Sequence, residues 1–474
     1  MTTDNIVLTR EQQECVNYSA GDLLVKGVAG SGKSVVILKR AIQLHKKEPN
    51  ATLKIITYAN TLVQYTNELF SAKMGAKTVA ATTADKFIWD LYFKMFGPTQ
   101  INYKSGELAS QAQLHYKHST NSTHRFMSTP SDFWAEEFLW IQGKCITTKE
   151  EYISTSRRGR GAQVRIAGPE EKAIVWDMYQ IFLALLKRSN SKTMEQMCID
   201  IINDRSKIPA SWKQDYIFID EAQDLTLGKL RVLKLCCNKT LTIAADMAQK
   251  LYKTSFTWKE AGIDVTGRAS KSLHKSFRST RQIVLLAEDL MAANRKESDL
   301  RSELTDAILP EVNGPKPMLY PFGNKTKRLM FLYKFLDKMV KDGSGKSIGI
   351  ICRTKTFCKN LQTTLNNCRI PYQEIIKGQD WKLLEPGVKV VTSHSSKGLE
   401  FDIVILPDFD NGYYPMLPAS LEDEQKAELL ATERNLAYVA MTRARERLII
   451  LADIRNKSPF IDEFKADHYD IMKP

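Results

Sequence analysis

Apolar positions recur along the chain with two different periods, which predicts strands followed by helices. Near the start, Asp22–Gly27 is a short apolar run, and Ser34–Lys47 has apolar residues at helical spacing with basic residues at its end. A second strand, Leu53–Ala59, and a second helix, Leu62–Met74, follow. This alternation of strand and helix predicts a parallel sheet covered by helices.

The region from Leu91 to Ser211 has a different pattern. Polar and Gly/Arg-rich loops precede Glu171–Ser189, which has apolar residues at helical spacing. Strand-to-loop units resume with Asp215–Asp224 and Leu241–Gln249. The middle region is therefore predicted to be a mainly helical, basic insertion in the first α/β unit.

A second α/β unit is predicted for the rest of the chain. Its expected strands are Ser347–Thr354, Val388–His394, Asp402–Asp408 and Arg447–Asp453. The predicted fold class is α/β, with two RecA-like P-loop domains that have parallel sheets, plus the inserted helical subdomain. The predicted boundaries are 1–90 with 212–269 for the first domain, 91–211 for the insertion and 270–474 for the second domain.

Composition adds a prediction about partners. The 474 residues have 43% hydrophobic and 26% charged content, which is typical of a soluble globular protein, yet the formal charge is +14. Such an excess favours a polyanion, with nucleic acid first and an anionic membrane surface second. No apolar run approaches the ~18 residues of a membrane span, and neither a secretory signal nor a disulfide spacing is visible. We therefore expect a cytoplasmic protein with no membrane partner.

The segment Gly27–Ser34, GVAGSGKS, fits the pattern G-x-x-x-x-G-K-[ST] between a predicted strand and a predicted helix. Its glycines allow backbone N–H groups to surround a phosphate at the start of the helix. Lys33 supplies positive charge, and the Ser34 hydroxyl is a ligand for Mg²⁺. ATP and Mg²⁺ are the expected cofactors. The predicted phosphate-binding residues are Gly27, Ala29, Gly30, Ser31, Gly32, Lys33 and Ser34.

Two acids follow the apolar run YIFI. The strand delivers Asp220 and Glu221 to its carboxyl end, where α/β sheets bind ligands. Asp220 is suited to help hold Mg²⁺, and Glu221 to orient or deprotonate a hydrolytic water. Paired acids after a strand are often only the start of a loop, but here they follow a phosphate-binding loop and indicate hydrolysis of a nucleoside triphosphate.

With DEAQD and the segments after it, the chain resembles the UvrD/PcrA/Rep-like superfamily 1 helicases nearly from end to end, outside the insertion. LTREQQECV is similar to the family's Q motif, which implies that Gln12 contacts adenine. The resemblance of ADMAQKLYKTSFTW implies a γ-phosphate sensor at Gln249. HKSFRSTRQI implies that Phe277 stacks on adenine and that Arg278 is an arginine finger. RNLAYVAMTRARERLIIL implies a second finger at Arg443.

The resemblance also implies contacts with nucleic acid. The segment TYAN implies Tyr58 and Asn60, and the weaker match TTADKF implies Thr83. The segment that begins with ADMAQ extends to Trp258, which the resemblance implies stacks on a base of the nucleic acid. The loop TSHSSKGLEF is similar to a motif that faces both ligands, with Thr392 and His394 toward the nucleic acid and Glu400 toward the ribose.

These features imply ATP-dependent translocation on single-stranded DNA, with 3′→5′ helicase activity. The stretch between IICRT and VVTSH is short where relatives insert a large helical subdomain, so unwinding has less support than translocation. One alternative is a motor subunit for a partner nuclease in repair or phage defence. Another is a nucleotide-gated nucleic-acid sensor with little turnover, against which Lys33, Glu221, Arg278 and Arg443 argue. The sequence does not separate DNA from RNA.

A glycine-containing basic loop in the insertion is a further candidate. Arg157, Arg158 and Arg160 in SRRGRG could contact phosphates. A solvated surface loop accounts for the same residues equally well.

Overall fold

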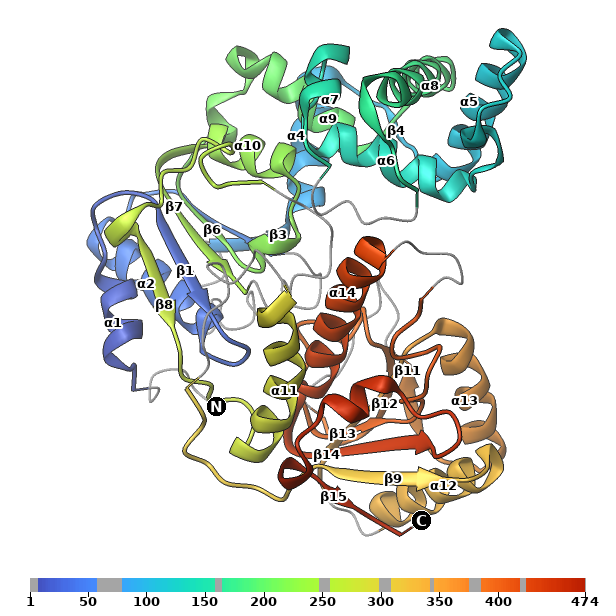
Figure 1. Cartoon of the computed structure of the whole chain (residues 1–474). Coiled ribbons are helices and arrows are strands. Elements are labelled where there is room, and N and C mark those ends of the chain that lie inside the picture. Colours follow the sequence, from blue (N-terminus) through green and yellow to red (C-terminus); the bar gives the residue numbers. More distant parts are fainter. Residues whose placement is uncertain are drawn as a thin grey trace.

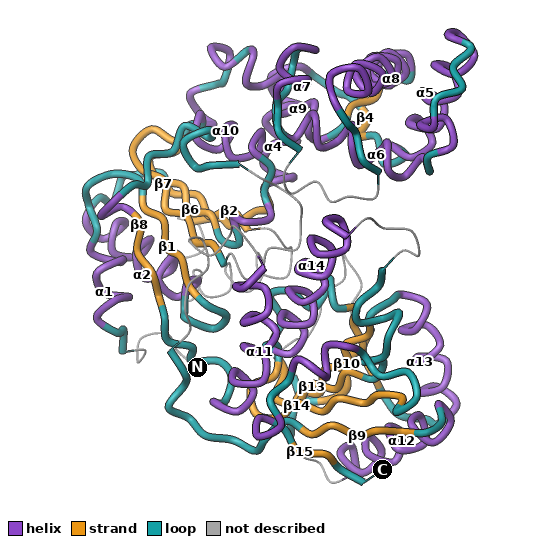
Figure 2. The backbone as a smooth tube through the Cα atoms, in the orientation of Figure 1, coloured by secondary structure: helices purple, strands orange, loops and turns teal. Residues whose placement is uncertain are grey.

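The computed structural model describes residues 7–57, 79–157, 164–246, 256–297, 308–341, 345–374, 385–417 and 423–473. Two parallel sheets lie in separate α/β domains, with a mostly helical insertion beside the first sheet (Figures 1 and 2). The predicted fold class is confirmed. Short 3-10 helices connect the larger elements at Arg125–Ser128, Arg205–Lys207, Ala210–Trp212, Ala222–Asp224, Gly267–Ala269, Pro459–Glu463 and Ala466–His468.

The first domain has a six-stranded sheet of order β3-β2-β6-β7-β1-β8. Its strands are β1 (Leu23–Gly27), β2 (Leu53–Thr57), β3 (Val79–Thr83), β6 (Gln214–Ile219), β7 (Cys237–Ala245) and β8 (Ser270–Leu273). Its helices are α1 (Arg10–Asn17), α2 (Lys33–Lys47), α4 (Ala84–Phe96), α9 (Met194–Asn203) and α10 (Leu227–Leu235). All the strand pairs of this sheet are parallel.

Helices cover both faces of this sheet, which explains its continuous apolar strands. Along β6, Ile217 and Ile219 pack in the core formed with α4, α9 and α10, whereas Phe218 packs with Ile37 and Leu38 of α2. Because side chains alternate across a strand, a run such as YIFI serves both cores at once.

The insertion has a core of its own, built mainly from aromatic side chains that include Trp134, Phe138 and Phe182. Its elements are β4 (Gln100–Ile101), α5 (Ser105–Thr120), α6 (Ser131–Gly143), α7 (Lys149–Ser154), α8 (Gly168–Arg188) and β5 (Ser191–Lys192). The pairing of β4 with β5 joins the two ends of the insertion. The independent unit is thus shorter than the predicted 91–211, because α9 and the end of α4 pack in the first-domain core.

The second domain has a seven-stranded sheet of order β11-β12-β10-β13-β14-β9-β15. Its strands are β9 (Met318–Phe322), β10 (Ser347–Cys352), β11 (Tyr372–Glu374), β12 (Gly387–Thr392), β13 (Phe401–Leu406), β14 (Ala444–Asp453) and β15 (Asp470–Ile471). Its helices are α11 (Arg281–Glu297), α12 (Lys325–Lys341), α13 (Lys355–Asn367) and α14 (Asp423–Met441). Helices α11 and α14 cover one face of this sheet, and α12 and α13 cover the other.

One predicted boundary needs correction. Strand β8 pairs with β1 through Leu24↔Ser270, so the first sheet extends past residue 269 and the second domain begins after Leu273. The sequence SKSL has neither an apolar run nor a clear alternation, and three of its four residues stay half-exposed at the sheet edge. Such an edge strand gives little signal in the sequence.

Candidate nucleotide site and nucleic-acid surface

The phosphate loop joins β1 to the first turn of α2. Gly30 and Gly32 have φ values of +72° and +82°, in the left-handed region that glycine adopts without strain. A Cβ atom on Gly32 would lie 2.5 Å from Gln12 Nε2. The hydroxyl of Ser31 is buried and has no hydrogen-bond partner among the described residues. A loop with these glycines, an unsatisfied hydroxyl and the start of a helix fits a bound phosphate group.

Lys33 is buried at the base of this loop. Its Nζ donates to the carbonyl oxygens of Gly27 at 2.8 Å and Val28 at 3.0 Å. It also forms an ion pair with Asp246 Oδ2 at 3.2 Å, and Asp246 follows the end of β7. The amine is therefore held by three oxygen atoms next to the position that the loop offers to phosphate.

Ser34 and Asp220 supply the oxygen atoms expected for Mg²⁺. The Ser34 hydroxyl donates to Asp220 Oδ2 at 2.6 Å. Burial and the neighbouring Glu221 raise the pKa of Asp220 to about 6. A nearby divalent cation favours the ionised carboxylate, and Mg²⁺ prefers hard oxygen ligands. These two side chains would hold Mg²⁺, which would supply positive charge to the phosphates.

Glu221 sits directly after this pair, in the left-handed conformation with φ of +55°. Burial raises its pKa, but the cations Lys397 and Lys33 outweigh burial, so that its pKa is lowered overall. The side-chain amide of Gln223 bridges two residues. Its Nε2 donates to Glu221 Oε2 at 2.5 Å, and its Oε1 accepts from the backbone N–H of Asp246 at 3.0 Å. Glu221 is thus an ionised carboxylate held in one orientation, and these are the properties that a general base for water needs.

Lys397 reaches this site from the other domain. It lies in the loop between β12 and β13, is buried, and pairs with Asp224 Oδ2 at 2.5 Å. Its Nζ is also 3.8 Å from Glu221 Oε2. Sequence reasoning assigned no role to Lys397, Asp224, Gln223 or Asp246. A lysine in a polar loop is common, and only the docking of the domains reveals its partner.

The two predicted arginine fingers are placed differently. Arg443 is fully buried, and its Nε donates to the Val439 carbonyl at 2.9 Å. Burial and the nearby Arg278 lower its pKa to about 9, so it remains charged at neutral pH. The Nε of Arg278 donates to Glu400 Oε1 at 2.7 Å, and Arg278 in turn lowers the pKa of Glu400.

Contacts between Phe277, Arg278 and the phosphate loop bring the two domains together. The backbone N–H of Phe277 donates to the Gly30 carbonyl at 2.9 Å. A Cβ atom on Gly30 would lie 2.4 Å from Arg278 Cβ, so only glycine permits this approach. Phe277 is 53% exposed as a residue, which leaves its ring available to stack on a base. Gln12 is close as well, and its Nε2 donates to the Ser31 carbonyl at 2.9 Å.

The residues expected to contact nucleic acid lie on different parts of the two domains. Thr83 is at the end of β3, where it caps α4 by accepting from the backbone N–H of Lys86 at 3.2 Å. Trp258 is partly buried against the first-domain core, with its ring centroid 5.5 Å from that of Phe256. Because part of its ring is used in packing, less of it is free to stack on a base.

The other two residues expected to contact nucleic acid are Thr392, the last residue of β12, and His394 in the loop that follows. Thr392 Oγ1 donates to Ser395 Oγ at 3.0 Å. His394 is exposed, and nearby protein atoms and Arg353 lower its pKa to about 4. It is therefore neutral at physiological pH and offers a hydrogen bond rather than charge. Tyr58, Asn60 and Gln249 lie outside the described residues.

The expectation for the basic loop fails at one of its three arginines. Arg157 Nη2 pairs with Glu137 Oε2 at 2.7 Å, and the Glu137 side chain is fully buried. Tyr152 also donates to Glu137 Oε1, at 2.8 Å. Because a buried carboxylate needs a compensating cation, Arg157 has a structural partner and is not available to phosphate. Arg158 and Arg160 lie outside the described residues.

Two family models match the chain over most of these elements. The UvrD/REP helicase N-terminal domain matches residues 8–274, and the UvrD-like helicase C-terminal domain matches residues 377–453. The chain belongs to the UvrD/REP helicase family. The matched ranges include the phosphate loop, the acid pair, the loop after β12 and Arg443.

Individual relatives agree with the family assignment. DNA helicase IV of Escherichia coli K12 is 24% identical over 361 residues, which are 70% of this chain and 49% of that protein. DNA helicase II of Rickettsia typhi is 44% identical over 63 residues, 13% of this chain and 9% of that protein. One subunit of the ATP-dependent helicase/nuclease of Geobacillus kaustophilus is 33% identical over 112 residues, 17% of this chain and 9% of that protein. The chain spans about half the length of these relatives, or less.

Within the described part of the chain, no helix is both long and apolar enough to cross a bilayer.

Proposed function

We propose that this chain is an ATP-dependent motor that moves along single-stranded DNA in the 3′→5′ direction, with ATP and Mg²⁺ as cofactors. The observation that carries the proposal is the convergence of Lys33, Ser34 and Glu221 from the first domain with Arg278 and Arg443 from the second. The resemblance to DNA helicases and the formal charge of +14 favour a nucleic-acid track.

The physical logic is that the nucleotide bridges two sheets. A γ-phosphate that contacts the first domain through Lys33 and the second through its arginines favours a closed cleft, and its loss favours an open one. If residues on the two domains hold the strand in alternation, each cycle of closing and opening moves the protein along it. Stacking of bases on aromatic rings is worth ~1–3 kcal/mol per base and does not depend on sequence.

The first test measures ATPase rates with and without single-stranded oligonucleotides. Lys33→Ala should lose nucleotide affinity, because it removes the charge beside the phosphates. Glu221→Gln should bind ATP yet fail to turn it over, because an amide cannot act as the base. Lys46→Ala, an exposed site on the same helix α2, is the matched control and should behave as wild type. Wild-type rates in both site variants would refute the proposed chemistry.

Direction and substrate need a second measurement. Displacement of streptavidin from a biotin at the 3′ or the 5′ end of a DNA or RNA strand reports which way the protein moves and on which polymer. We expect displacement at the 5′ end of DNA alone. The segment between β10 and β12 is short at the place where the family resemblance implies a large helical subdomain in relatives. We therefore expect this protein to separate duplexes more slowly than it moves on single strands.

A motor subunit for a nuclease is the second candidate. The match to the helicase/nuclease of Geobacillus kaustophilus favours it. Affinity purification from the native host, followed by unwinding assays with and without the recovered protein, separates the two candidates. A co-purified nuclease that raises the unwinding rate would identify the chain as part of such an assembly.

A further inference from the structure

One segment of the second domain is strongly basic. Residues 325–367 contain ten Lys and Arg residues but only two acids, Asp337 and Asp342, a net charge of +8 in a chain whose total is +14. This segment forms α12, β10 and α13. None of these residues belongs to the nucleotide site described above, and Arg353 lies near His394, one of the residues expected to contact nucleic acid.

Four lysines of α12 share one side of that helix. Lys327, Lys334, Lys338 and Lys341 are spaced by seven, four and three residues, which places them on one face of an α-helix. All four are exposed, and they cover about 21 Å at 1.5 Å per residue. We call these four residues the α12 lysine stripe. The opposite face of α12, with Leu332 and Leu336, packs on the sheet.

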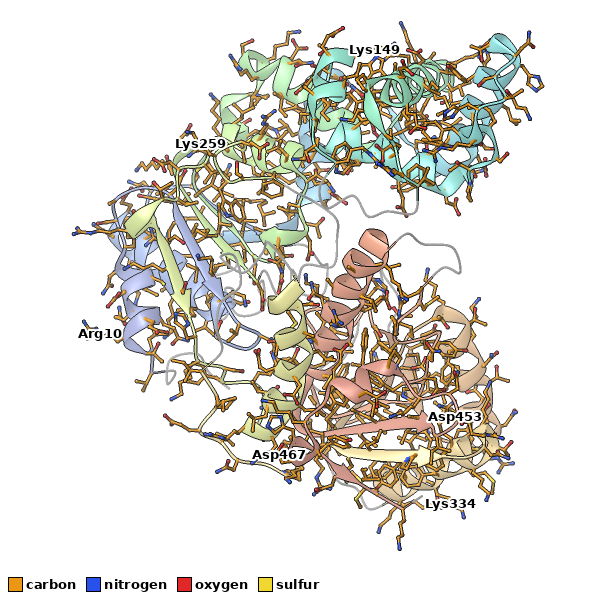
Figure 3. The ribbon with its side chains drawn as sticks, viewed as in Figure 1. Arg10, Lys149, Lys259, Lys334, Asp453 and Asp467 are labelled. Atoms are coloured by element: carbon orange, nitrogen blue, oxygen red, sulfur yellow. The ribbon has the colours of Figure 1, made fainter. Side chains whose placement is uncertain are left out.

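Helix α13 extends this basic surface. Lys355 and Lys359 are exposed one turn apart on α13, which contains no acidic residue. Leu336 of α12 and Leu361 of α13 pack in the same core cluster, so the two helices cover the same face of the sheet. Figure 1 shows both helices on the side of the sheet that faces away from the first domain, and Lys334 projects outward at that edge in Figure 3. The surface therefore lies apart from the nucleotide cleft.

Most of these lysines have no acidic partner in the described part of the chain. Lys341 pairs with Asp337 at 2.7 Å, but Lys327, Lys334 and Lys338 form no ion pair there. By contrast, the exposed Lys86 of α4 pairs with Asp90 at 3.0 Å. Like charges at i,i+4 on a helix destabilise it by a few tenths of a kcal/mol per pair. The stability of α12 therefore does not explain the stripe.

We propose that the α12 lysine stripe, with Lys355 and Lys359, binds the phosphate backbone of double-stranded DNA outside the motor cleft. The proposal rests on the proposed function, since it assumes that the protein works on nucleic acid. It adds a second contact surface, which would hold a duplex arm while the cleft holds a single strand.

The chemistry of the surface favours a duplex over a single strand. Surfaces for single strands combine positive charge with exposed aromatic rings, whereas the α12 aromatics Phe331, Tyr333 and Phe335 pack against the core. A duplex has one phosphate charge per ~1.7 Å, or about twelve along the length of the stripe. A protein partner would need more apolar area than Met330 and Val340, the large apolar residues exposed on α12.

The test neutralises three unpaired lysines together, Lys327→Gln, Lys334→Gln and Lys338→Gln. The matched control is Lys46→Gln, Lys47→Gln and Lys473→Gln, which removes the same charge from exposed sites elsewhere. Anisotropy of a short labelled blunt duplex is measured over a range of salt concentrations. In the stripe variant, the slope of log Kd against log salt should fall by up to about 2.7 units, at about 0.9 for each phosphate that is no longer neutralised. The control should keep the wild-type slope.

Other outcomes would overturn the proposal. An unchanged slope in the stripe variant would exclude the contact, and equal losses in both triple variants would reduce it to an effect of net charge. Loss of binding to vesicles of phosphatidylserine, with duplex binding intact, would assign the surface to a membrane. ATPase stimulation by short single strands should stay at the wild-type level in the stripe variant. Absence of that stimulation in the wild type would refute the proposed function, while duplex anisotropy would still decide on the stripe.

Discussion

The two sides of the cleft hold their charged side chains in different ways. In the first domain, the partners come from the same domain: Lys33 pairs with Asp246, and the Ser34 hydroxyl donates to Asp220. In the second domain, Arg278 pairs with Glu400 of the same domain, whereas Lys397 has its partners Glu221 and Asp224 across the cleft. The difference suggests that the first domain alone can bind a triphosphate. We expect Lys397 to add its charge to the site only when the second domain is docked.

This comparison has a consequence for catalysis. An arginine that stabilises charge developing on the γ-phosphate acts mainly in the transition state and contributes little to ground-state binding. We therefore expect loss of a cleft arginine of the second domain to lower mainly turnover, whereas loss of Lys33 in the first domain should weaken nucleotide binding.

The largest effect is expected at Arg278. Arg278→Ala should lower kcat by about 10³, the low end for an arginine finger, because Arg443 remains. ATP affinity, measured by equilibrium binding, should change far less. Glu400→Gln is the paired control, since it removes the negative charge beside Arg278 but keeps the guanidinium. It should raise KM more than it lowers kcat. A loss of ATP affinity with normal kcat in Arg278→Ala would make Arg278 a structural residue.

A smaller effect is expected for the pair across the cleft. Lys397→Met leaves Asp224 buried without its cation, and burial already raises the pKa of Asp224 to about 6. We expect kcat/KM to fall and the double variant with Asp224→Asn to recover part of the loss. Groups in contact commonly show coupling free energies of 0.5–3 kcal/mol, so about 1–2 kcal/mol is expected here. Additive effects in the four-protein cycle would show that the ion pair does not couple the domains.

The smallest effect is expected at Phe277. Phe277→Leu should raise KM for ATP several-fold at unchanged kcat, because aromatic stacking contributes roughly 0.5–1.5 kcal/mol to ground-state binding. Phe277→Tyr retains the ring and should match the wild type. A drop in kcat in the leucine variant would instead indicate that the contact between Phe277 and Gly30 controls the docking of the domains.

The sequence by itself determined those parts of the site that lie within one loop. In GVAGSGKS and DEAQD, the spacing of a few residues fixes the geometry, because each short loop follows a buried strand that sets its position. The same local signals were sufficient for the α/β class, the two parallel sheets and the family. They failed at β8, whose four residues have no apolar pattern.

Only the tertiary structure decided which charges meet. Lys397 and Arg157 are both basic residues in polar loops, yet one lies beside Glu221 and the other beside the buried Glu137. Likewise, the spacing of the α12 lysines places them on one face, but the packing of Leu332 and Leu336 on the sheet turns that face to solvent. The physical reason is that a charge pair depends on distance in space. Residues far apart in the sequence reach that distance only when the domains fold and dock.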